Sequence, residues 1–373
     1  MDIYNLLRKL TETPGPSGLE VALRETLIDV WRPLADEITV DRMGNLLALK
    51  RGSDASSATG NGEQKRQPRL LLAAHMDEIA LMVKKIDQYD PEGNGEGGGF
   101  LLVTSVGGVD VRHLYGQAVV VHGQNDLPGI IGALPKSMLP DANSSKVYGF
   151  DELVVDVGLS ADELRKQVSV GDFISFHQRL RKLLNDRVSG KALDNRASVA
   201  AVTTALEYLQ GRRHEWDVIA VATTQEETRL LGAFTSAFAQ HPDVAVAVDV
   251  TFAKGPGTKD NQLFEMDEGP TVGLGPNVHP GVQKKLQDAA EALEMKVHTD
   301  PHSSRSGTDA YGLQIAREGI PTGLVGIPLR YMHTMVETVA TADVERAGRL
   351  LGEFAARLDE GFLEEIAKEM VER

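Results

Sequence analysis

The chain has 373 residues, 42% of them hydrophobic, which is enough to bury one large core or two ordinary ones. Its formal net charge is -15, from 54 acidic and 39 basic residues with no dense Lys/Arg cluster, so we expect it to bind neither nucleic acid nor an anionic membrane. The absence of cysteine excludes disulfides, thiolate nucleophiles and Cys-ligated zinc. Any metal must therefore be held by histidines and carboxylates.

The N-terminal stretch "MDIYNLLRKLTETPGPSG" lacks the basic-then-apolar order of a signal peptide. No window reaches the roughly 18 apolar residues of a membrane span. We therefore expect a cytoplasmic protein.

The first predicted elements are a helix and a hairpin. Residues 17–35, "SGLEVALRETLIDVWRPLA", have the pattern of an amphipathic helix with Ser17 as its N-cap. Residues 37–52, "EITVDRMGNLLALKRG", indicate two strands that turn at Gly44-Asn45. The polar, unpatterned segment 51–68 follows and is predicted to be a solvated loop.

Short Val/Gly-rich runs separated by turn residues occupy the next part of the chain, from "GFLLVTSVGGVD" to "VGDFISF". Strands at this spacing predict a small β-rich domain, PDZ-like or a barrel, inserted at residues 81–186.

Helices and apolar strands alternate on the far side of this insertion. Helices are predicted at 195–211, 230–241, 281–295 and from about 341, with strands at 216–224, 243–250 and 323–328. This alternation predicts an α/β/α sandwich with a mixed, mostly parallel sheet, formed by residues 1–80 and 187–373.

Potential metal ligands follow several of the predicted strands or lie close to a predicted helix. In a mostly parallel sheet, functional groups collect beyond the carboxyl ends of the strands, so we expect these side chains to share one edge. The set is His75, Asp77, Asp194, Glu226, Glu227, Asp249 and His333.

Imidazole and carboxylate ligands suit zinc, cobalt or manganese, and a two-metal hydrolase needs one carboxylate that bridges the ions. Asp194 is the candidate for the bridge. A separate carboxylate must move a proton, so one of Glu226 and Glu227 is expected to bind metal while the other stays free. Asp77 is placed to accept the second ring N–H of His75.

Each of these residues also has an ordinary structural interpretation. The two glutamates suit the first turn of a helix, and Asp194 suits a helix N-cap. Asp249 can be a turn residue, and His333 a half-buried histidine bonded to backbone. Only the joint arrangement at the strand ends favours a site.

The motifs carry a family resemblance that extends over essentially the whole chain. In order, "AAHMDEI", "ALDNRAS", "TTQEETRLLGA", "VAVDVTFA", "SGTDAYG" and "IPLRYMHTMVE" resemble the dinuclear-metal aminopeptidases that form tetrahedral (TET) assemblies. This is the family of glutamyl aminopeptidase and of proteins formerly labelled endo-1,4-glucanases. "GIIGALPKSM" and "LVVDVGLSADELRKQVSVGDFISF", inside the insertion, resemble it too.

The resemblance implies a zinc-exopeptidase-like catalytic domain with two Zn²⁺ or Co²⁺ ions per subunit, or Mn²⁺ in their place. It implies that peptides with a free N-terminus are trimmed one residue at a time. It also implies that the inserted domain makes dimers and that six dimers form a homododecamer. The implied roles are His75, Asp194 and Asp249 on one ion; Asp194, Glu227 and His333 on the other; Glu226 as general base; and Asp77 as orienting carboxylate.

Two features depart from the family pattern. Met335 in "HTMVE" stands where members commonly have proline, and the turn "DPEGNGEGGGF" in the insertion is long and glycine-rich.

Other functions remain open at the level of sequence. A related amide hydrolase, such as a carboxypeptidase or an N-acyl amino-acid deacylase, fits the same ligands, and so does a non-catalytic scaffold of the same fold.

Four more polar residues either lie near the site or are ordinary cap and surface residues: Arg305, Thr308, Asp309 and Arg330.

Overall fold

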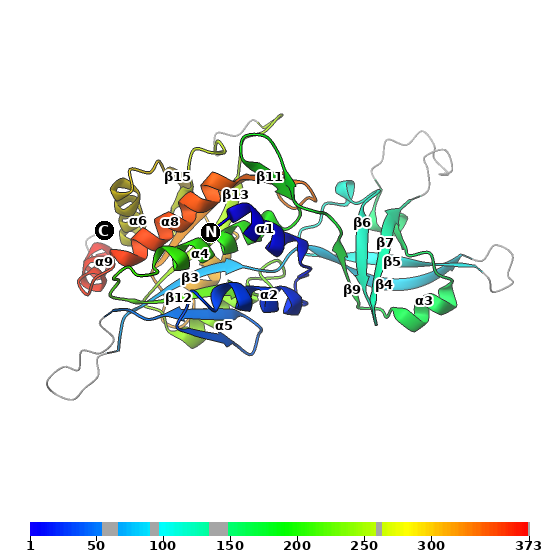
Figure 1. Ribbon diagram of the computed structural model, residues 1–373, viewed down its shortest axis with the longest axis horizontal. Helices are drawn as coiled ribbons and strands as arrows, with labels where there is room; N and C mark the ends of the chain where they lie inside the picture. Colours follow the sequence, from blue (N-terminus) through cyan, green and yellow to red (C-terminus); the bar gives the residue numbers. More distant parts are fainter. Residues whose placement is uncertain (54–65, 90–96, 134–147, 259–262, 372–373) are drawn as a thin grey trace.

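The computed structural model describes residues 1–53, 66–89, 97–133, 148–258 and 263–371. They form two lobes along the long axis of the molecule (Figure 1). The larger lobe contains a sheet of eleven strands, and the smaller one contains a closed barrel.

The large sheet is mixed, with four parallel strands at its centre. The pairs β12–β3, β3–β13 and β13–β16 are all parallel. From edge to edge the order is β1 (Glu37–Val40), β2 (Leu46–Lys50), β12 (Asp217–Thr223), β3 (Arg69–His75), β13 (Val244–Phe252), β16 (Thr322–Arg330), β17 (Glu337–Ala340), β11 (Arg187–Gly190) and β10 (Arg181–Lys182). Beside this path, β14 (Thr271–Leu274) pairs with β16 and with β15 (His298–Pro301).

Both faces of the central strands are apolar. The strands are almost continuously apolar in sequence, and alternate side chains point to opposite faces of a strand. In β3, Leu70 and Leu72 pack with the helices of one face, and Leu71 and Ala73 pack with those of the other. The first face carries α1 (Ile3–Glu12), α2 (Val21–Trp31), α4 (Leu193–Tyr208), α6 (Pro280–Ala292), α8 (Thr341–Ala356) and α9 (Phe362–Val371). The second carries α5 (Leu231–Gln240) and α7 (Asp309–Gln314). Figure 1 shows α1, α4 and α8 across the first face.

The barrel closes in the order β4 (Ala80–Tyr89), β5 (Gly98–Val106), β8 (Val154–Asp156), β7 (Asp126–Gly132), β6 (Ala118–His122) and β9 (Phe173–Phe176). It has its own apolar core, which α3 (Ala161–Gln167) helps to cover through Leu164. The α/β/α sandwich with an added β-rich domain is therefore confirmed. The boundaries at residues 80 and 187 stay a prediction.

Three details of the sequence analysis need correction. The second helix begins at Val21 after Glu20, without a side-chain cap, so Ser17 is not its N-cap. Ser17 lies in the preceding loop, where its backbone N–H donates to the carbonyl of Glu78. Helix α1 was missed, and the single helix expected from 341 is two helices, α8 and α9.

Two predicted loops fall partly outside the described residues, namely 54–65 of the first and 90–96 of the glycine-rich turn. In the part of the chain that is described, no helix has the length and hydropathy that crossing a membrane requires.

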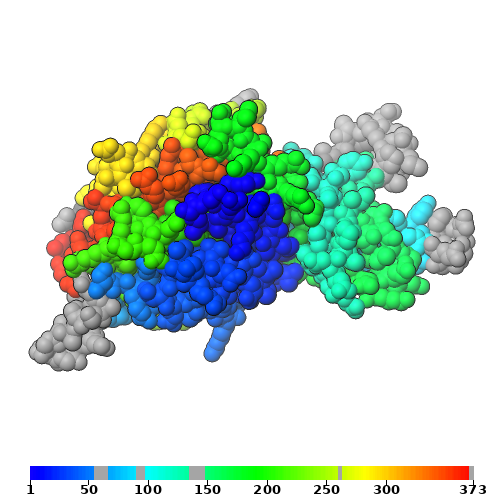
Figure 2. Space-filling model, viewed as in Figure 1, coloured from blue at the N-terminus to red at the C-terminus, as the bar shows by residue number. Residues whose placement is uncertain are grey.

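A buried charge cluster fastens the N-terminal segment to the larger lobe. Arg196 of α4 is fully buried and donates to the carbonyls of Leu10 (2.6 Å) and Met76 (3.2 Å) and to Glu78 Oε1 (3.1 Å). Lys191 Nζ lies 2.6 Å from Glu78 Oε2. Burial alone would raise the pKa of Glu78, but the charges of Arg196 and Lys191 outweigh it and lower that pKa. Figure 2 shows the N-terminal residues (blue) packed on the larger lobe beside the barrel.

We expect Arg196→Met to lower thermal stability strongly, because it leaves Glu78 Oε1 and several backbone carbonyls without the Arg196 donor, although Lys191 still pairs with Oε2. Breaking a buried ion pair on one side costs about 3–5 kcal/mol. The control is Arg51→Met, which removes an exposed pair with Glu37 and should change stability little. Calorimetric melting at equal protein and metal concentrations measures both, and equal shifts would contradict the prediction.

Candidate metal centre

The candidate ligands converge where the central parallel strands end. His75 is the last residue of β3 and pairs in register with Thr223, the last residue of the neighbouring β12. Glu226 and Glu227 follow β12 in the loop before α5, which begins at Leu231. Their alternative interpretation as residues of a helix's first turn is therefore wrong.

The remaining candidates reach the same place from other elements. Asp249 lies in β13, Asp194 at the start of α4, and His333 in the turn between β16 and β17. Regular helical geometry in α4 begins only after Asn195, so Asp194 does not act as a simple N-cap. All six candidate ligands and bases, His75, Asp194, Glu226, Glu227, Asp249 and His333, line one cavity of about 1100 Å³.

The first group of side chains is centred on His75. Its Nε2 lies 3.2 Å from Asp194 Oδ1, 3.8 Å from Glu226 Oε2 and 4.0 Å from Asp249 Oδ1. The second group is centred on His333, whose Nε2 lies 3.4 Å from Asp194 Oδ2 and 3.8 Å from Glu227 Oε2. The two oxygens of Asp194 therefore face two different histidines.

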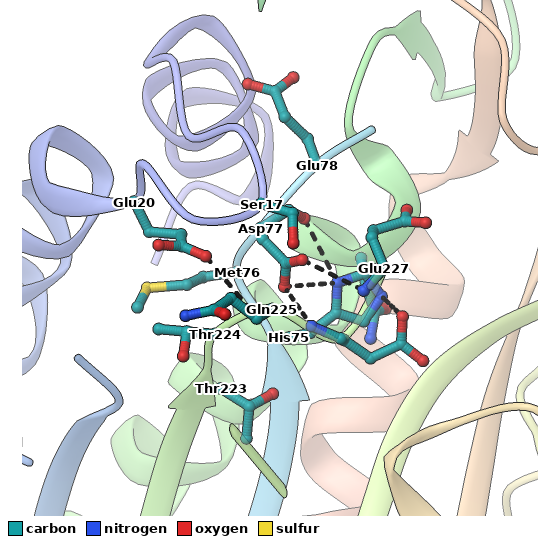
Figure 3. A network of polar contacts seen from close by, with 12 residues as sticks. Ser17, Glu20, His75, Met76, Asp77, Glu78, Thr223, Thr224, Gln225 and Glu227 are labelled. Atoms are coloured by element: carbon teal, nitrogen blue, oxygen red, sulfur yellow. Dashed lines mark hydrogen bonds and ion pairs between the residues drawn. The ribbon is translucent and has the colours of Figure 1, made fainter. Parts of the chain in front are cut away.

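The carboxylate of Asp77 holds the loop that carries both glutamates. Its two oxygens accept the backbone N–H groups of Glu226 (3.1 Å) and Glu227 (3.2 Å). His75 Nδ1 lies 3.5 Å from Asp77 Oδ1 and 3.3 Å from the Asp77 carbonyl oxygen. Figure 3 shows Asp77 between His75 and the turn of Gln225 and Glu227. Nδ1 thus faces Asp77, and Nε2 faces the cluster.

A second buried carboxylate, Glu20, supports the same turn. Its Oε1 accepts the backbone N–H of Gln225 at 3.2 Å and that of Gly18 at 2.7 Å. Gln225 has φ +54°, a left-handed conformation that is uncommon outside glycine. Three consecutive amides, of Gln225, Glu226 and Glu227, are thus held by two buried carboxylates. Sequence reasoning missed Glu20, because an acid beside a helix start looks like an ordinary helix residue.

Glu337 is another residue that the sequence analysis did not single out. It is 2% exposed, and its two oxygens accept the backbone N–H groups of His333 (2.9 Å) and Asp194 (3.0 Å). The only signal in the sequence was its place at the end of "HTMVE".

The barrel also reaches the cavity, through the loop after β5. A Cβ atom added at Gly108 would lie 2.6 Å from His333 Nδ1, and one at Gly107 would lie 3.0 Å from Glu227 Oε2. Gly108 lines the cavity. Side chains are excluded there because the barrel backbone packs directly against the second group.

The four additional polar residues divide into two kinds. Arg305 and Thr308 line the cavity, and Asp309 is buried behind it with Oδ2 accepting a hydrogen bond of 2.5 Å from Thr223 Oγ1. Arg330 instead bonds through Nε to the carbonyl of Lys254.

The electrostatics of the cluster show an excess of negative charge. Burial raises the pKa of Glu226 to about 10 and that of Glu227 to about 7, and it raises the pKa of Asp249 well above its ordinary value. His333 has its pKa raised to about 9, mainly by its hydrogen bond with Asp194. For His75, burial opposes the charged form, but the nearby carboxylates outweigh it and raise the pKa.

Divalent cations fit this arrangement of donors. Zinc bonds of about 2.0–2.1 Å in tetrahedral geometry place neighbouring ligand atoms about 3.4 Å apart. The two carboxylate oxygens of Asp194 lie close to that spacing from a ring nitrogen of each histidine, at 3.2 Å from His75 and 3.4 Å from His333. Two sets can each hold one ion, because their donor atoms lie within 4.8 Å of one another: His75, Glu226 and Asp249, and Asp194, Glu227 and His333. Glu226 Oε2 lies 3.8 Å from His75 Nε2, and Asp249 Oδ1 lies 4.0 Å from it. Distances alone therefore do not decide which of these two carboxylates is a ligand.

Comparison with known proteins identifies the family. The model of the M42 glutamyl aminopeptidase family matches residues 55–350. A lysyl aminopeptidase of Pyrococcus furiosus is 33% identical over 93% of this chain and 95% of its own. This chain is a peptide hydrolase. It belongs to the M42 glutamyl aminopeptidase family.

Solved structures agree in fold over almost the entire chain. A TET aminopeptidase from the marine sediment archaeon Thaumarchaeota archaeon SCGC AB-539-E09 has a TM-score of 0.87 and 29% identity, with 98% of both chains covered. The TET1 peptidase of Pyrococcus horikoshii has a TM-score of 0.80 and 29% identity, with 96% of this chain and all of the other covered. That protein is described as assembling into a tetrahedron or a large octahedral shell.

We expect Asp77→Asn to loosen the loop that carries the two glutamates. An amide offers one acceptor oxygen and turns an NH₂ toward the second backbone N–H. An unpaired buried group costs about 1–3 kcal/mol, so amide exchange across residues 223–233 should be about tenfold faster or more. Hydrogen-exchange mass spectrometry measures it, and turnover should fall as well.

The matched control is Asp343→Asn, since Asp343 is also fully buried and accepts two backbone N–H groups on its two oxygens, those of Asp267 and Gly269. Its effect should stay near residues 267–269. Unchanged exchange over 223–233 in Asp77→Asn would show that Asp77 does not hold the loop.

Proposed function

We propose that this peptide hydrolase is an aminopeptidase that uses two divalent metal ions, zinc or cobalt, with manganese as a possible substitute. The observation that carries the proposal is the position of Asp194, with one oxygen 3.2 Å from His75 and the other 3.4 Å from His333. A carboxylate placed between two histidines in this way suits a bridge between two ions.

The ligands divide between the two ions as follows in this proposal. His75, Asp194 and Asp249 bind one ion, and Asp194, Glu227 and His333 bind the other. Bound ions supply an acidified water at neutral pH and polarise the carbonyl of the scissile bond. The excess of buried carboxylate at the cavity supports this assignment, because cations stabilise the charged carboxylates that burial, and then repulsion between them, disfavours by raising the pKa values of Glu226 and Glu227.

Glu226 acts as the general base. It lines the cavity, and its backbone is held through Asp77, which leaves the carboxylate free to face the substrate. Glu226 accepts a proton from the water as the oxygen attacks the carbonyl carbon of the first peptide bond. It then passes the proton to the amine nitrogen as the C–N bond breaks. Asp77 orients His75 and the loop, and does not touch the substrate.

The substrates are peptides with an unblocked N-terminus. Support comes from the family and from relatives described as lysyl and glutamyl aminopeptidases. The test uses protein stripped by a chelator, reconstituted with each metal in turn and assayed on a panel of aminoacyl-nitroanilides. We expect no hydrolysis without metal, and hydrolysis of free but not N-acetylated substrates with it. Cleavage of N-acetylated substrates would identify a deacylase instead.

The same assay separates the two adjacent glutamates. Glu226→Gln should keep both ions and lose about 10²–10⁴-fold in turnover, because only proton transfer is removed. Glu227→Ala, its control, should lose metal first and regain part of its activity at excess metal. Normal turnover in Glu226→Gln would refute the assignment of the base.

We also propose that the inserted barrel, residues 81–186, mediates dimers and that six dimers form a dodecamer. The likeness to a peptidase that assembles into a tetrahedron or octahedral shell supports this. Light scattering should then give a mass far above the 40.4 kDa of one chain. A mass near that of the single chain under all conditions would contradict the assembly.

A further inference from the structure

Glu337 connects two residues that the proposed function places on the same ion. Its Oε1 accepts the backbone N–H of His333 at 2.9 Å, and its Oε2 accepts that of Asp194, 143 positions away in sequence, at 3.0 Å. No other carboxylate in the described part of the chain accepts the backbone N–H groups of both these residues.

The position of Glu337 is itself rigid. It is the first residue of β17, it pairs in register with Gly190 of β11, and it is 2% exposed. Strand β17 lies between β16 and β11 in the large sheet. The carboxylate therefore presents two fixed acceptor atoms to the turn of His333 and to the start of α4.

Both segments have backbone conformations that need such support. His333 has φ +61° and Tyr331 has φ +62°, left-handed values that non-glycine residues seldom adopt without an external restraint. Ala192, two residues before Asp194, also has a positive φ of +57°. Without an acceptor, the buried amide of Asp194 and the part-buried amide of His333 would lose their partner.

We propose that Glu337 is a positioning residue that sets the spacing between Asp194 Oδ2 and His333 Nε2 and so preforms the second ion site. The inference rests on the proposed function, because it takes Asp194, Glu227 and His333 as ligands of one ion. Glu337 bonds to the backbone of two of these ligands and leaves their side chains free to face the cavity.

The arrangement parallels that of Asp77, which accepts the backbone N–H groups of Glu226 and Glu227 (Figure 3). His75 is oriented through Asp77, and Asp249 through the bond from the Val250 N–H to its Oδ1. Neither depends on Glu337. Loss of the Glu337 carboxylate should therefore weaken the second site more than the first.

Glutamine cannot replace glutamate at this position. It keeps one acceptor oxygen, but its NH₂ group faces a backbone N–H, so two donors meet in a buried place. Outer partners of metal ligands typically change metal affinity by about 10–100-fold when removed. The same range is expected here for the second ion, with a smaller effect on the first, because the two ions share Asp194 but only the second is bound by His333.

The test is a cobalt titration of full-length protein that has been stripped by a chelator, followed by calorimetry and by visible absorption. Wild-type protein should bind two equivalents of Co²⁺. Glu337→Gln should bind the second about 10–100-fold more weakly and the first, which shares only Asp194 with it, with a clearly smaller change. At limiting cobalt its kcat should fall with KM nearly unchanged, and kcat should recover at excess cobalt.

The matched control is Asp343→Asn. Asp343 is also fully buried and accepts two backbone N–H groups, those of Asp267 (2.5 Å) and Gly269 (2.9 Å), but it does not line the cavity. This variant should melt at a lower temperature and still bind two cobalt ions as the wild type does. Glu337→Asp keeps both carboxyl oxygens but is one methylene shorter, and it should also weaken the second ion if Glu337→Gln does not fold.

Wild-type affinity for the second ion in Glu337→Gln or Glu337→Asp would overturn the inference and leave the proposed function standing. So would equal weakening of both ions, or a loss of thermal stability like that of Asp343→Asn with both ions bound normally. Wild-type protein that binds fewer than two cobalt ions would overturn both the inference and the two-metal proposal.

Discussion

The site depends on buried carboxylates that bond to backbone N–H groups. Asp77 accepts the N–H groups of Glu226 and Glu227, Glu337 accepts those of Asp194 and His333, and Glu20 accepts those of Gly18 and Gln225. Glu78 has a similar role in the buried charge cluster, where it accepts the backbone N–H of Gly15 and pairs with Lys191 and Arg196. Charge-assisted bonds of this kind are stronger than neutral ones, and they are stronger still away from water.

This framework explains how five separate segments can hold side chains 3–4 Å apart. Strand ends bring the segments to one edge of the sheet, but strand geometry alone leaves each loop free to move. The left-handed turns at Gln225 and His333 are conformations that the loops would not keep unaided. The carboxylates beneath them restrain the turns, so that the acids of the cavity stay close in spite of their mutual repulsion.

The barrel contributes to the cavity as well as forming a separate lobe. Its Gly107-Gly108 turn lies against Glu227 and His333, at distances that leave no room for a side chain. In the sequence this pair looked like one more turn in a glycine-rich stretch. A motion of the barrel relative to the large sheet would therefore change the wall of the cavity beside the second group.

The sequence by itself determined the fold class and six of the acids and imidazoles that line the cavity, although it did not single out Asp300 and His302, which line it too. Both follow from local pattern, because apolar periodicity sets which segments become buried strands, and the polar residues that end those strands follow directly in the chain. Because the sequence contains no cysteine, the possible metal donors were limited to histidines and carboxylates. Asp194 was expected beside both histidines, and it lies there.

Only the tertiary structure decided which carboxylates face the cavity and which serve the backbone. In the sequence, nothing separates Glu20 and Glu337 from Glu226 and Asp249, and Asp77 is expected to orient His75 but not to hold two backbone N–H groups. The partners of Asp77, Glu20 and Glu337 are amides up to 205 positions away, which no local pattern encodes. Whether a carboxylate can reach a cation or an N–H group depends on burial and on where distant loops cross, and those are properties of the folded chain.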